Sequence, residues 1–378
     1  MSLYCRVCDA ALGATPSLSY CGMPKSAQYF PDEFNAGNDF GVDLHVYECN
    51  ACGLIQLSAE PVSYYREVIR ATSVSAEMAA FRHDQFTDWV EKYQLHQKKV
   101  LEVGCGRGEY LEILAQTGVD AYGVEYGELA SEHCQSLGLN VEKLFLEDRL
   151  TRVAACPFDA FVMLNFLEHL PSPVHSLQAI ADNLKSDAIG LVEVPNFEMI
   201  MEKELFSEFI PDHLSYFSKE TLITTLNLAG FEVLSCQAVW HDYNLSAVVR
   251  KRATKNLKRF ELFQHDLKRQ LDHYINIFPS NSVAIWGAGH QALAIMALAN
   301  LSGKIRFVVD SAKFKQNKLT PATHIPITAP AKLEQEPIAA IIIMAGSFSD
   351  EIYRILKTMR LNNPGIAVVD GANLKILE

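Results

Sequence analysis

The stretch VLEVGCGRGEYLEIL, residues 100–114, decides the fold of the middle of the chain. Its apolar start predicts a buried strand, and Gly104, Gly106 and Gly108 predict a tight turn that opens directly into a helix. Glycine lets the backbone turn sharply and approach a ligand closely. The stretch therefore predicts a cofactor site where a strand of a parallel sheet meets the next helix.

Acidic residues at strand ends support this prediction. Glu102 lies just before the turn that also contains Cys105, where its carboxylate can meet a cationic amino group. Glu125 ends the next strand, about 20 residues further on, where a ribose diol needs an acceptor. Leu146 and Glu147 follow the third strand and can border an adenine. A nicotinamide dinucleotide is the alternative cofactor, but the turn lacks the G-x-G-x-x-G spacing typical of that class.

Apolar runs alternate with helical segments from Lys99 onward. We expect strands at KVLEVG, DAYGVE, NVEKLF, DAFVML and IGLVEV, and a closing hairpin at FEVLSCQAVW and YNLSAVVRK. Strand–helix alternation predicts an α/β fold with a mostly parallel sheet. We assign this domain to residues 61–250, with lead-in helices over 61–97, and a linker helix to 251–279. The apolar stripe of the linker helix is formed by Leu257, Phe260, Leu267, Leu271 and Ile275.

Bulk composition narrows the class of protein. The chain has 378 residues, of which 49% are hydrophobic, so two or three packed domains are expected. A net charge of −12 argues against a nucleic-acid partner. The N-terminus resembles no secretory signal, and no apolar run reaches the length of a membrane span. We expect a cytoplasmic enzyme that contacts neither membrane nor nucleic acid.

Two C-x2-C pairs mark the N-terminal region, which we assign to residues 1–60. Cys5 and Cys8 form one pair, and Cys49 and Cys52 form the other. Four thiolates satisfy one tetrahedral zinc ion and leave no open position, so we predict a structural Zn²⁺. Cys21 is interpreted as an ordinary core cysteine rather than a fifth ligand.

A second strand–helix pattern begins near residue 280. We assign residues 280–378 to a smaller Rossmann-like α/β domain. IWGAGHQA, residues 285–292, follows a strand and opens a helix, and Asp310 ends the next strand. This spacing fits a dinucleotide fingerprint. Because a chain with one cofactor site seldom requires a second, we expect no nicotinamide there.

At this point the residues resemble a known superfamily. E-x-G-x-G-x-G followed by a strand-terminal acid is similar to the first two motifs of class I S-adenosylmethionine (SAM) methyltransferases, and MLNFLEHLPSP, residues 163–173, is similar to their motif after the fourth strand. The resemblance implies SAM as cofactor and places Asn165 at its methionine end. Glu168 and His169 are a frequent pair at this position, and we interpret His169 as mainly structural.

Nearly the whole chain resembles zinc-containing sugar C-methyltransferases. The resemblance rests on the two cysteine pairs, on the glycine turn, on DHLSYFS at 212–218 and on VVDSAKFKQNKLTPATHIPI at 308–327. It implies methylation of a nucleotide-linked 4-keto-deoxysugar at carbon 3. Three positions depart from the family pattern: Ile210 and Arg70 stand where the family has tyrosines, and Pro211 stands where it has a histidine.

The chemistry requires a group that accepts a proton from the methyl acceptor. His213 is the predicted base, because imidazole titrates near neutral pH, with Asp212 or Glu208 as its orienting partner. Arg70 is predicted to meet a substrate phosphate or carboxylate, and Asn196 to touch the sugar.

In the C-terminal domain, Gly289, His290 and Gln291 are predicted to contact the acceptor through free backbone N–H groups at a helix start, with Lys313 and Lys315 as helpers. The expected partner is a small molecule, a nucleotide sugar. Two other readings stay open: an O- or N-methyltransferase for another small metabolite, and a non-catalytic scaffold that binds SAM.

Overall fold

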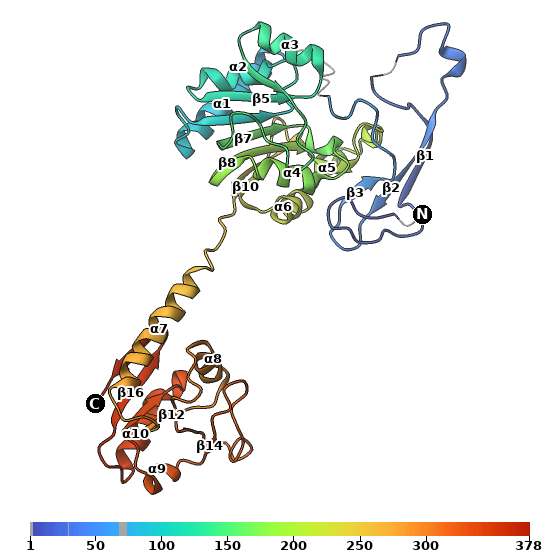
Figure 1. The fold of residues 1–378 in the computed structure, drawn as a ribbon. Helices are drawn as coiled ribbons and strands as arrows, with labels where there is room; N and C mark the ends of the chain where they lie inside the picture. Colours follow the sequence, from blue (N-terminus) through green and yellow to red (C-terminus); the bar gives the residue numbers. More distant parts are fainter. Residues whose placement is uncertain (1–2, 29, 68–73) are drawn as a thin grey trace. The chain divides into compact units, whose positions relative to one another are not determined.

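The computed structural model describes residues 3–28, 30–67 and 74–378. The chain divides into two compact units, residues 1–254 and 255–378. The first contains an antiparallel N-terminal sheet and a larger mixed sheet, and the second contains a mixed α/β sheet of its own (Figure 1). The sequence prediction of an α/β protein with a flanking N-terminal module and a second, C-terminal α/β domain is confirmed.

The N-terminal sheet is completed by a strand from far along the chain. Its order is β1 (Leu18–Met23), β2 (Val42–Glu48), β3 (Ile55–Leu57) and β9 (Ser215–Tyr216), with all neighbours antiparallel. Ile55 pairs with Tyr216, so β3 lies beside the segment that carries His213. An apolar cluster that includes Leu44, Leu57 and Phe209 packs on this sheet. The N-terminal module is therefore joined to the wall of the candidate site.

The central sheet has seven strands in the order β10-β11-β8-β7-β4-β5-β6. Those strands are β4 (Lys99–Val103), β5 (Asp120–Glu125), β6 (Asn140–Lys143), β7 (Phe158–Leu164), β8 (Leu184–Pro195), β10 (Phe231–Val239) and β11 (Asn244–Lys251). β4 to β8 pair in parallel, whereas β10 and β11 form an antiparallel hairpin on β8. The sequence predicted these strands and the hairpin. The carboxyl ends of β4, β5 and β7 meet at one edge, where ligands bind in sheets of this kind.

Helices cover both faces of this sheet. They are α1 (Ala76–Tyr93), α2 (Glu109–Gln116), α3 (Glu128–Ser136), α4 (Pro173–Ala181) and α6 (Lys219–Leu228). α5 (Phe197–Glu202) contributes Met199 and Ile200 to the cluster on the N-terminal sheet, and the short 3-10 turns are η1 (Ala36–Asn38), between β1 and β2, η2 (Leu167–His169) and η3 (Phe206–Glu208). α1 begins where the Ser75 side chain accepts from the Met78 amide at 3.1 Å, which satisfies a free N–H of the first turn. Its apolar face buries Phe86, Trp89 and Val90 against one side of the sheet.

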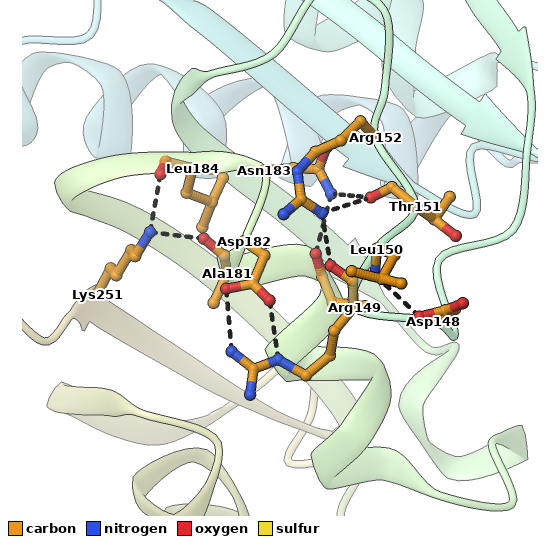
Figure 2. A network of polar contacts seen from close by, with 11 residues as sticks. Asp148, Arg149, Leu150, Thr151, Arg152, Ala181, Asp182, Asn183, Leu184 and Lys251 are labelled. Carbon is orange, nitrogen blue, oxygen red and sulfur yellow. Dashed lines mark hydrogen bonds and ion pairs between the residues drawn. The ribbon is translucent and has the colours of Figure 1, made fainter.

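A polar network fastens the edge of the sheet where β11 ends. The Lys251 ammonium donates to the carbonyl oxygens of Ala181 and Leu184, at 2.6 and 2.8 Å (Figure 2). A cation at the C-terminal end of α4 is favourable because the last carbonyls of a helix lack backbone partners. Arg149 forms two hydrogen bonds with the Asp182 carboxylate in the same network. The Lys251 contacts hold the end of β11 against the end of α4 and the start of β8.

The C-terminal unit has the strand order β14-β13-β12-β15-β16-β17, with only β17 antiparallel. The strands are β12 (Val283–Trp286), β13 (Phe307–Val309), β14 (Ile327–Thr328), β15 (Ala340–Ile343), β16 (Gly365–Asp370) and β17 (Asn373–Ile376). Its helices are α7 (Arg259–Asn276), α8 (His290–Leu298), α9 (Lys332–Gln335) and α10 (Ser349–Thr358), with the turn η4 (Gly346–Phe348).

Two details of the sequence analysis need correction. In the predicted apolar stripe of α7, Leu267, Leu271 and Ile275 are buried, but Leu257 and Phe260 are about two-thirds exposed at 68% and 67%. The buried part is the one that packs on the C-terminal core. Cys21 is exposed on β1, so its interpretation as a core cysteine was wrong. Among the described residues, no helix is both long and apolar enough to cross a membrane.

Candidate active site

The four predicted thiolates come together at the start of the chain. Cys5 and Cys52 have sulfurs 3.5 Å apart, Cys8 and Cys49 have sulfurs 3.6 Å apart, and all four lie within 4.8 Å of one another. Tight turns shape both pairs, since Asp9 donates to the Cys5 carbonyl and Gly53 to that of Cys49. Tetrahedral Zn–S bonds of 2.3 Å require sulfurs about 3.8 Å apart. The cluster is therefore compatible with a structural zinc ion.

The glycine turn forms as predicted between β4 and α2. Gly104, Gly106 and Gly108 all have positive φ, at 73°, 56° and 89°. A side chain at Gly108 would meet Leu139 at 2.6 Å, so only glycine fits there without a shift. The Glu125 carboxylate accepts from the Gly106 amide at 2.9 Å and from the Gly127 amide at 2.7 Å. Glu125 thus holds the turn in shape.

The other predicted cofactor residues surround this turn. Glu102 and Cys105 are buried at the end of β4 and in the turn itself. Leu146 is buried beside Gly104 and Phe145, in the place predicted for an adenine. Glu147 is partly exposed and forms an ion pair with Arg66 at 3.1 Å. Sequence reasoning missed Arg66, whose guanidinium also lies over the rings of Tyr65, Tyr126 and Phe145.

A cavity of about 550 Å³ lies at the carboxyl end of β7, where Leu164 and Asn165 line it. Its wall comes from the segment before α1, from the first residues after β7, from the 210–213 segment and from the β10–β11 turn. Asn165 lies in this wall with φ 50°, and its amide nitrogen donates to the Asn244 side chain at 2.9 Å. Predicted residues Asp212 and His213 also line the cavity. The cavity is large enough for a small polar acceptor.

Three side chains with nitrogen or oxygen ligand atoms converge at one side of this cavity. The ligand atoms of Glu168, His169 and His213 all lie within 4.8 Å of one another. The His169 and His213 rings pack edge to face, with centroids 4.8 Å apart. The two segments are tied together, because the Leu214 amide donates to the Glu168 carbonyl at 2.8 Å. Sequence reasoning named the Glu168–His169 pair but not its convergence with His213.

Burial sets the charge of this cluster. It raises the pKa of Glu168 to about 8 and, together with the nearby His169, lowers the pKa of His213 to about 3. Burial also lowers the pKa of His169, partly offset by its bond to Asp212. Both imidazoles are consequently neutral at physiological pH, with one nitrogen lone pair each. A neutral imidazole can accept a proton or bind a cation.

The Asp212 carboxylate has other partners than the predicted one. Its oxygens accept from the Tyr64 hydroxyl at 2.5 Å and from the Ala27 amide at 2.8 Å. Its backbone carbonyl lies 2.7 Å from Nδ1 of His169. Among the described residues, Asp212 therefore orients His169 and fastens the N-terminal loop. Glu208, the other predicted partner of His213, accepts at its backbone carbonyl from Tyr216 at 3.3 Å.

A buried ion pair forms a further part of the wall. Arg82 on α1 is 1% exposed and donates to the Glu193 carboxylate at 2.5 Å. Gln85 donates to the other oxygen of Glu193, also at 2.5 Å. Sequence reasoning missed this network, because α1 and β8 are more than 100 residues apart. An arginine at a helical, mostly polar position gives no sign of burial.

Asn196 and Arg70 are the other residues that were predicted to contact the methyl acceptor. Asn196 is buried; its oxygen accepts from the Glu198 amide at the start of α5, and its nitrogen donates to the Asp242 carbonyl. These contacts give it a structural role, and its contact with the acceptor stays a prediction. Arg70 lies outside the described residues.

In the C-terminal unit, Gly287 has φ 126°, and a side chain there would meet the Met344 carbonyl oxygen at 2.4 Å. Asp310 accepts from the Ala288 amide at 3.0 Å and pairs with Lys315 at 2.9 Å. The predicted segment Gly289–Gln291 is exposed at the start of α8, and Lys313 is exposed too. Asp310 thus holds the glycine turn of this unit, as Glu125 holds that of the central domain.

Comparisons with known proteins agree with this geometry. Residues 75–236 match a family described as a methyltransferase domain, and residues 245–369 match one described as the C-methyltransferase C-terminal domain. C-methyltransferase NovU of Streptomyces niveus is 22% identical, over 92% of this chain and 90% of that protein.

Other relatives match only part of the chain. A ubiquinone biosynthesis O-methyltransferase of Actinobacillus pleuropneumoniae serotype 5b (strain L20) is 33% identical, but over 25% of this chain and 44% of that protein. A SAM-dependent methyltransferase structure from Aquifex aeolicus aligns with 20% identity and a TM-score of 0.36, over 44% of this chain and 89% of that one, which is too weak a likeness to bear on function. With the glycine turn, its strand-end acid and both family matches in agreement, the chain is a SAM-dependent methyltransferase with a C-methyltransferase C-terminal domain.

Proposed function

We propose that this enzyme transfers the methyl group of SAM to a carbon atom beside the ketone of a nucleotide-linked deoxysugar. The observation that carries the proposal is the match of residues 245–369 to the C-methyltransferase C-terminal domain, together with a protein named as a C-methyltransferase that aligns over nearly the full chain. The sugar acceptor rests on the sequence resemblance at the cysteine pairs, at residues 212–218 and at residues 308–327.

Residues around the glycine turn fit SAM, and we assign them to it. Gly104 and Gly106 have positive φ, which allows close approach of the backbone, and we assign the ribose hydroxyls to Glu125 at the end of β5. When bound, SAM supplies an electrophilic methyl group on a sulfonium, which leaves as a neutral thioether. We also assign the four-cysteine cluster to a structural zinc ion, which would stabilise the N-terminal module.

The protein must remove a proton from the acceptor carbon and position that carbon for in-line attack on the methyl group. His213, in its neutral form at the cavity wall, is our candidate for the proton acceptor. A base works best with a pKa near the operating pH, so uptake of a proton by His213 needs a nearby negative charge. Glu168 in the same cluster is uncharged near neutral pH, because burial raises its pKa to about 8, and it supplies such a charge only after losing its proton.

Proton exchange tests this assignment without requiring methyl transfer. The enzyme is incubated in deuterated water with S-adenosylhomocysteine and a nucleotide-linked 4-keto-deoxysugar, and deuterium at the carbon beside the ketone is followed by NMR. Exchange is expected in the wild type and should fall by roughly 100-fold or more in His213→Ala. Equal exchange in both proteins would dismiss the role of His213.

An O-methyltransferase is the second candidate, because part of the chain is 31–36% identical to several ubiquinone biosynthesis O-methyltransferases. Those matches cover no more than 27% of this chain. The C-methyltransferase reading accounts for more of the molecule.

A further inference from the structure

The turn that joins β10 to β11 has a strained backbone. Trp240, His241 and Asp242 follow one another with positive φ, at 51°, 56° and 65°. Residues with a side chain rarely adopt this left-handed conformation, which persists only where the surrounding structure imposes it. Two aromatic side chains of this segment, those of Trp240 and Tyr243, line the cavity at the carboxyl end of β7. The strain is therefore located where the protein presents aromatic rings to the candidate active site.

Asn196, which follows β8, holds this turn in shape. Its side-chain nitrogen donates to the Asp242 carbonyl at 2.9 Å, and its backbone amide donates to the Tyr243 carbonyl at 2.8 Å. Within the turn, the Tyr243 amide donates to the Trp240 carbonyl at 3.0 Å. Asn196 is buried, so water competes little for these bonds. One residue outside the turn thus fixes two of its carbonyl groups.

The indole of Trp240 is held by neighbouring rings as well. It packs against Phe81 on α1, with centroids 5.1 Å apart, and against the His241 ring, with centroids 5.2 Å apart. A side chain that is already fixed in place loses little conformational freedom when a ligand binds to it. Trp240 is therefore a preformed aromatic surface in the cavity wall.

We propose that Trp240 binds the sugar ring of the methyl acceptor through the face of its indole, and that Asn196 is the positioning residue of the turn that carries it. This inference rests on the proposed function and extends it to the residue that recognises the sugar. The face of an aromatic ring is partly negative and attracts weakly positive C–H hydrogens. A deoxysugar suits such a surface, because it has C–H bonds where other sugars have hydroxyl groups.

A further hydrogen bond connects this turn to the cofactor side of the cavity. Asn244 comes directly after the turn, and its side-chain oxygen accepts from the Asn165 amide nitrogen at 2.9 Å. The sequence resemblance places Asn165 at the methionine end of SAM, next to the sulfonium that carries the methyl group. The acceptor carbon must come close to that end for in-line attack. Sugar binding by Trp240 leaves His213, in the same wall, free to take up the proton.

Tryptophan fluorescence reports on this contact without requiring methyl transfer. The chain has three tryptophans, of which Trp89 and Trp286 are 4% and 3% exposed, whereas Trp240 lines the cavity. Full-length protein with S-adenosylhomocysteine is titrated with a nucleotide-linked 4-keto-deoxysugar and, separately, with the nucleoside diphosphate alone. We expect the sugar compound, but not the nucleoside diphosphate, to change the emission. The change should vanish in Trp240→Phe and remain in the matched control Trp89→Phe.

Steady-state kinetics then measure what the contact contributes. Trp240→Ala should raise the acceptor KM at least about fivefold with little change in kcat, because the sugar ring is held alike before and during the reaction. Trp240→Phe should recover part of the loss, since a phenyl ring keeps an aromatic face. SAM affinity, measured by isothermal titration, should stay at the wild-type value in both variants and serves as the check on folding.

A serine at position 196 separates the two roles of Asn196. In Asn196→Ser the hydroxyl can still accept from the Glu198 amide at the start of α5, but the donor to the Asp242 carbonyl is lost. We expect the acceptor KM to rise about two- to tenfold. The same substitution made in Trp240→Ala should add nothing further, because Asn196 acts through Trp240.

Several results would overturn the proposal. An equal change of emission with the nucleoside diphosphate alone would place the base rather than the sugar on the indole. An unchanged acceptor KM in folded Trp240→Ala would dismiss the contact, and a full additional effect of Asn196→Ser in Trp240→Ala would dismiss the positioning role. Each of these results leaves C-methylation standing, since the methylated atom is identified separately by NMR. Wild-type protein that binds no nucleotide-linked deoxysugar would instead contradict the proposed function, and this contact with it.

Discussion

Replacing Glu125 by alanine tests how the cofactor turn is held. The variant removes an acceptor from two buried N–H groups, those of Gly106 at 2.9 Å and of Gly127 at 2.7 Å. Each unsatisfied donor costs about 1–3 kcal/mol, so we expect the free energy of unfolding to fall by roughly 2–6 kcal/mol. Loss of the proposed ribose acceptor should weaken SAM binding by a further 1–3 kcal/mol, about 5- to 150-fold in Kd.

Isothermal titration with SAM and chemical unfolding measure the two effects separately. Glu128→Ala is the control, because Glu128 is an acid close by in the sequence whose exposed pair with Lys143 is worth at most about 1 kcal/mol. We expect that variant to bind SAM as the wild type does. An unchanged SAM affinity in folded Glu125→Ala would refute the ribose assignment, and an unchanged free energy of unfolding would refute the importance of the two backbone bonds.

Four further predictions follow from other parts of the molecule. Metal analysis should find about one zinc per chain, lost in Cys49→Ser and kept in Cys21→Ser, whose thiol is exposed; a zinc-free wild type would contradict the cysteine assignment. Gly287→Ala should destabilise the C-terminal unit by about 1–3 kcal/mol, because φ is 126° and the added carbon meets Met344, whereas Gly289→Ala has open space; equal unfolding curves would be the contrary result. Arg82→Met should cost about 3–5 kcal/mol in urea unfolding by leaving the Glu193 carboxylate buried without its cation, and a loss below about 1 kcal/mol would argue against that pair. If Gly289–Gln291 contacts the acceptor, His290→Ala with Gln291→Ala should raise the acceptor KM and leave SAM affinity unchanged; unaltered KM would end that prediction.

Local signals in the sequence were enough to predict the cofactor turn and the four-cysteine cluster. The glycines at 104, 106 and 108 must adopt positive φ, and the strand-end acid lies at a fixed distance in the chain, so both could be predicted without tertiary information. The same is true of the two C-x2-C pairs, because a single contact between the two pairs brings all four sulfurs together. The alternation of apolar strands and helices likewise gave the central sheet and its closing hairpin.

The cavity wall could not be predicted, because its contacts join segments that are distant in the chain. Tyr64 meets Asp212 across 148 positions, and Arg82 meets Glu193 across 111. Asp212 was expected to orient His213, but its carboxylate is taken by Tyr64 and Ala27, and its carbonyl holds His169 instead. The pairing of β9 with β3 helps to bring the 210–216 segment beside the N-terminal module, and a two-residue strand leaves no periodic signal in the sequence.

The position of the transferred methyl group tests the central claim most directly. The enzyme is incubated with SAM carrying a ¹³C-labelled methyl group and with nucleotide-linked 4-keto-deoxysugars, and the labelled product is examined by carbon–proton NMR. We predict a methyl group bonded to the sugar carbon next to the ketone, with loss of one proton signal at that carbon. A methyl group bonded to oxygen or nitrogen would contradict the proposed C-methylation.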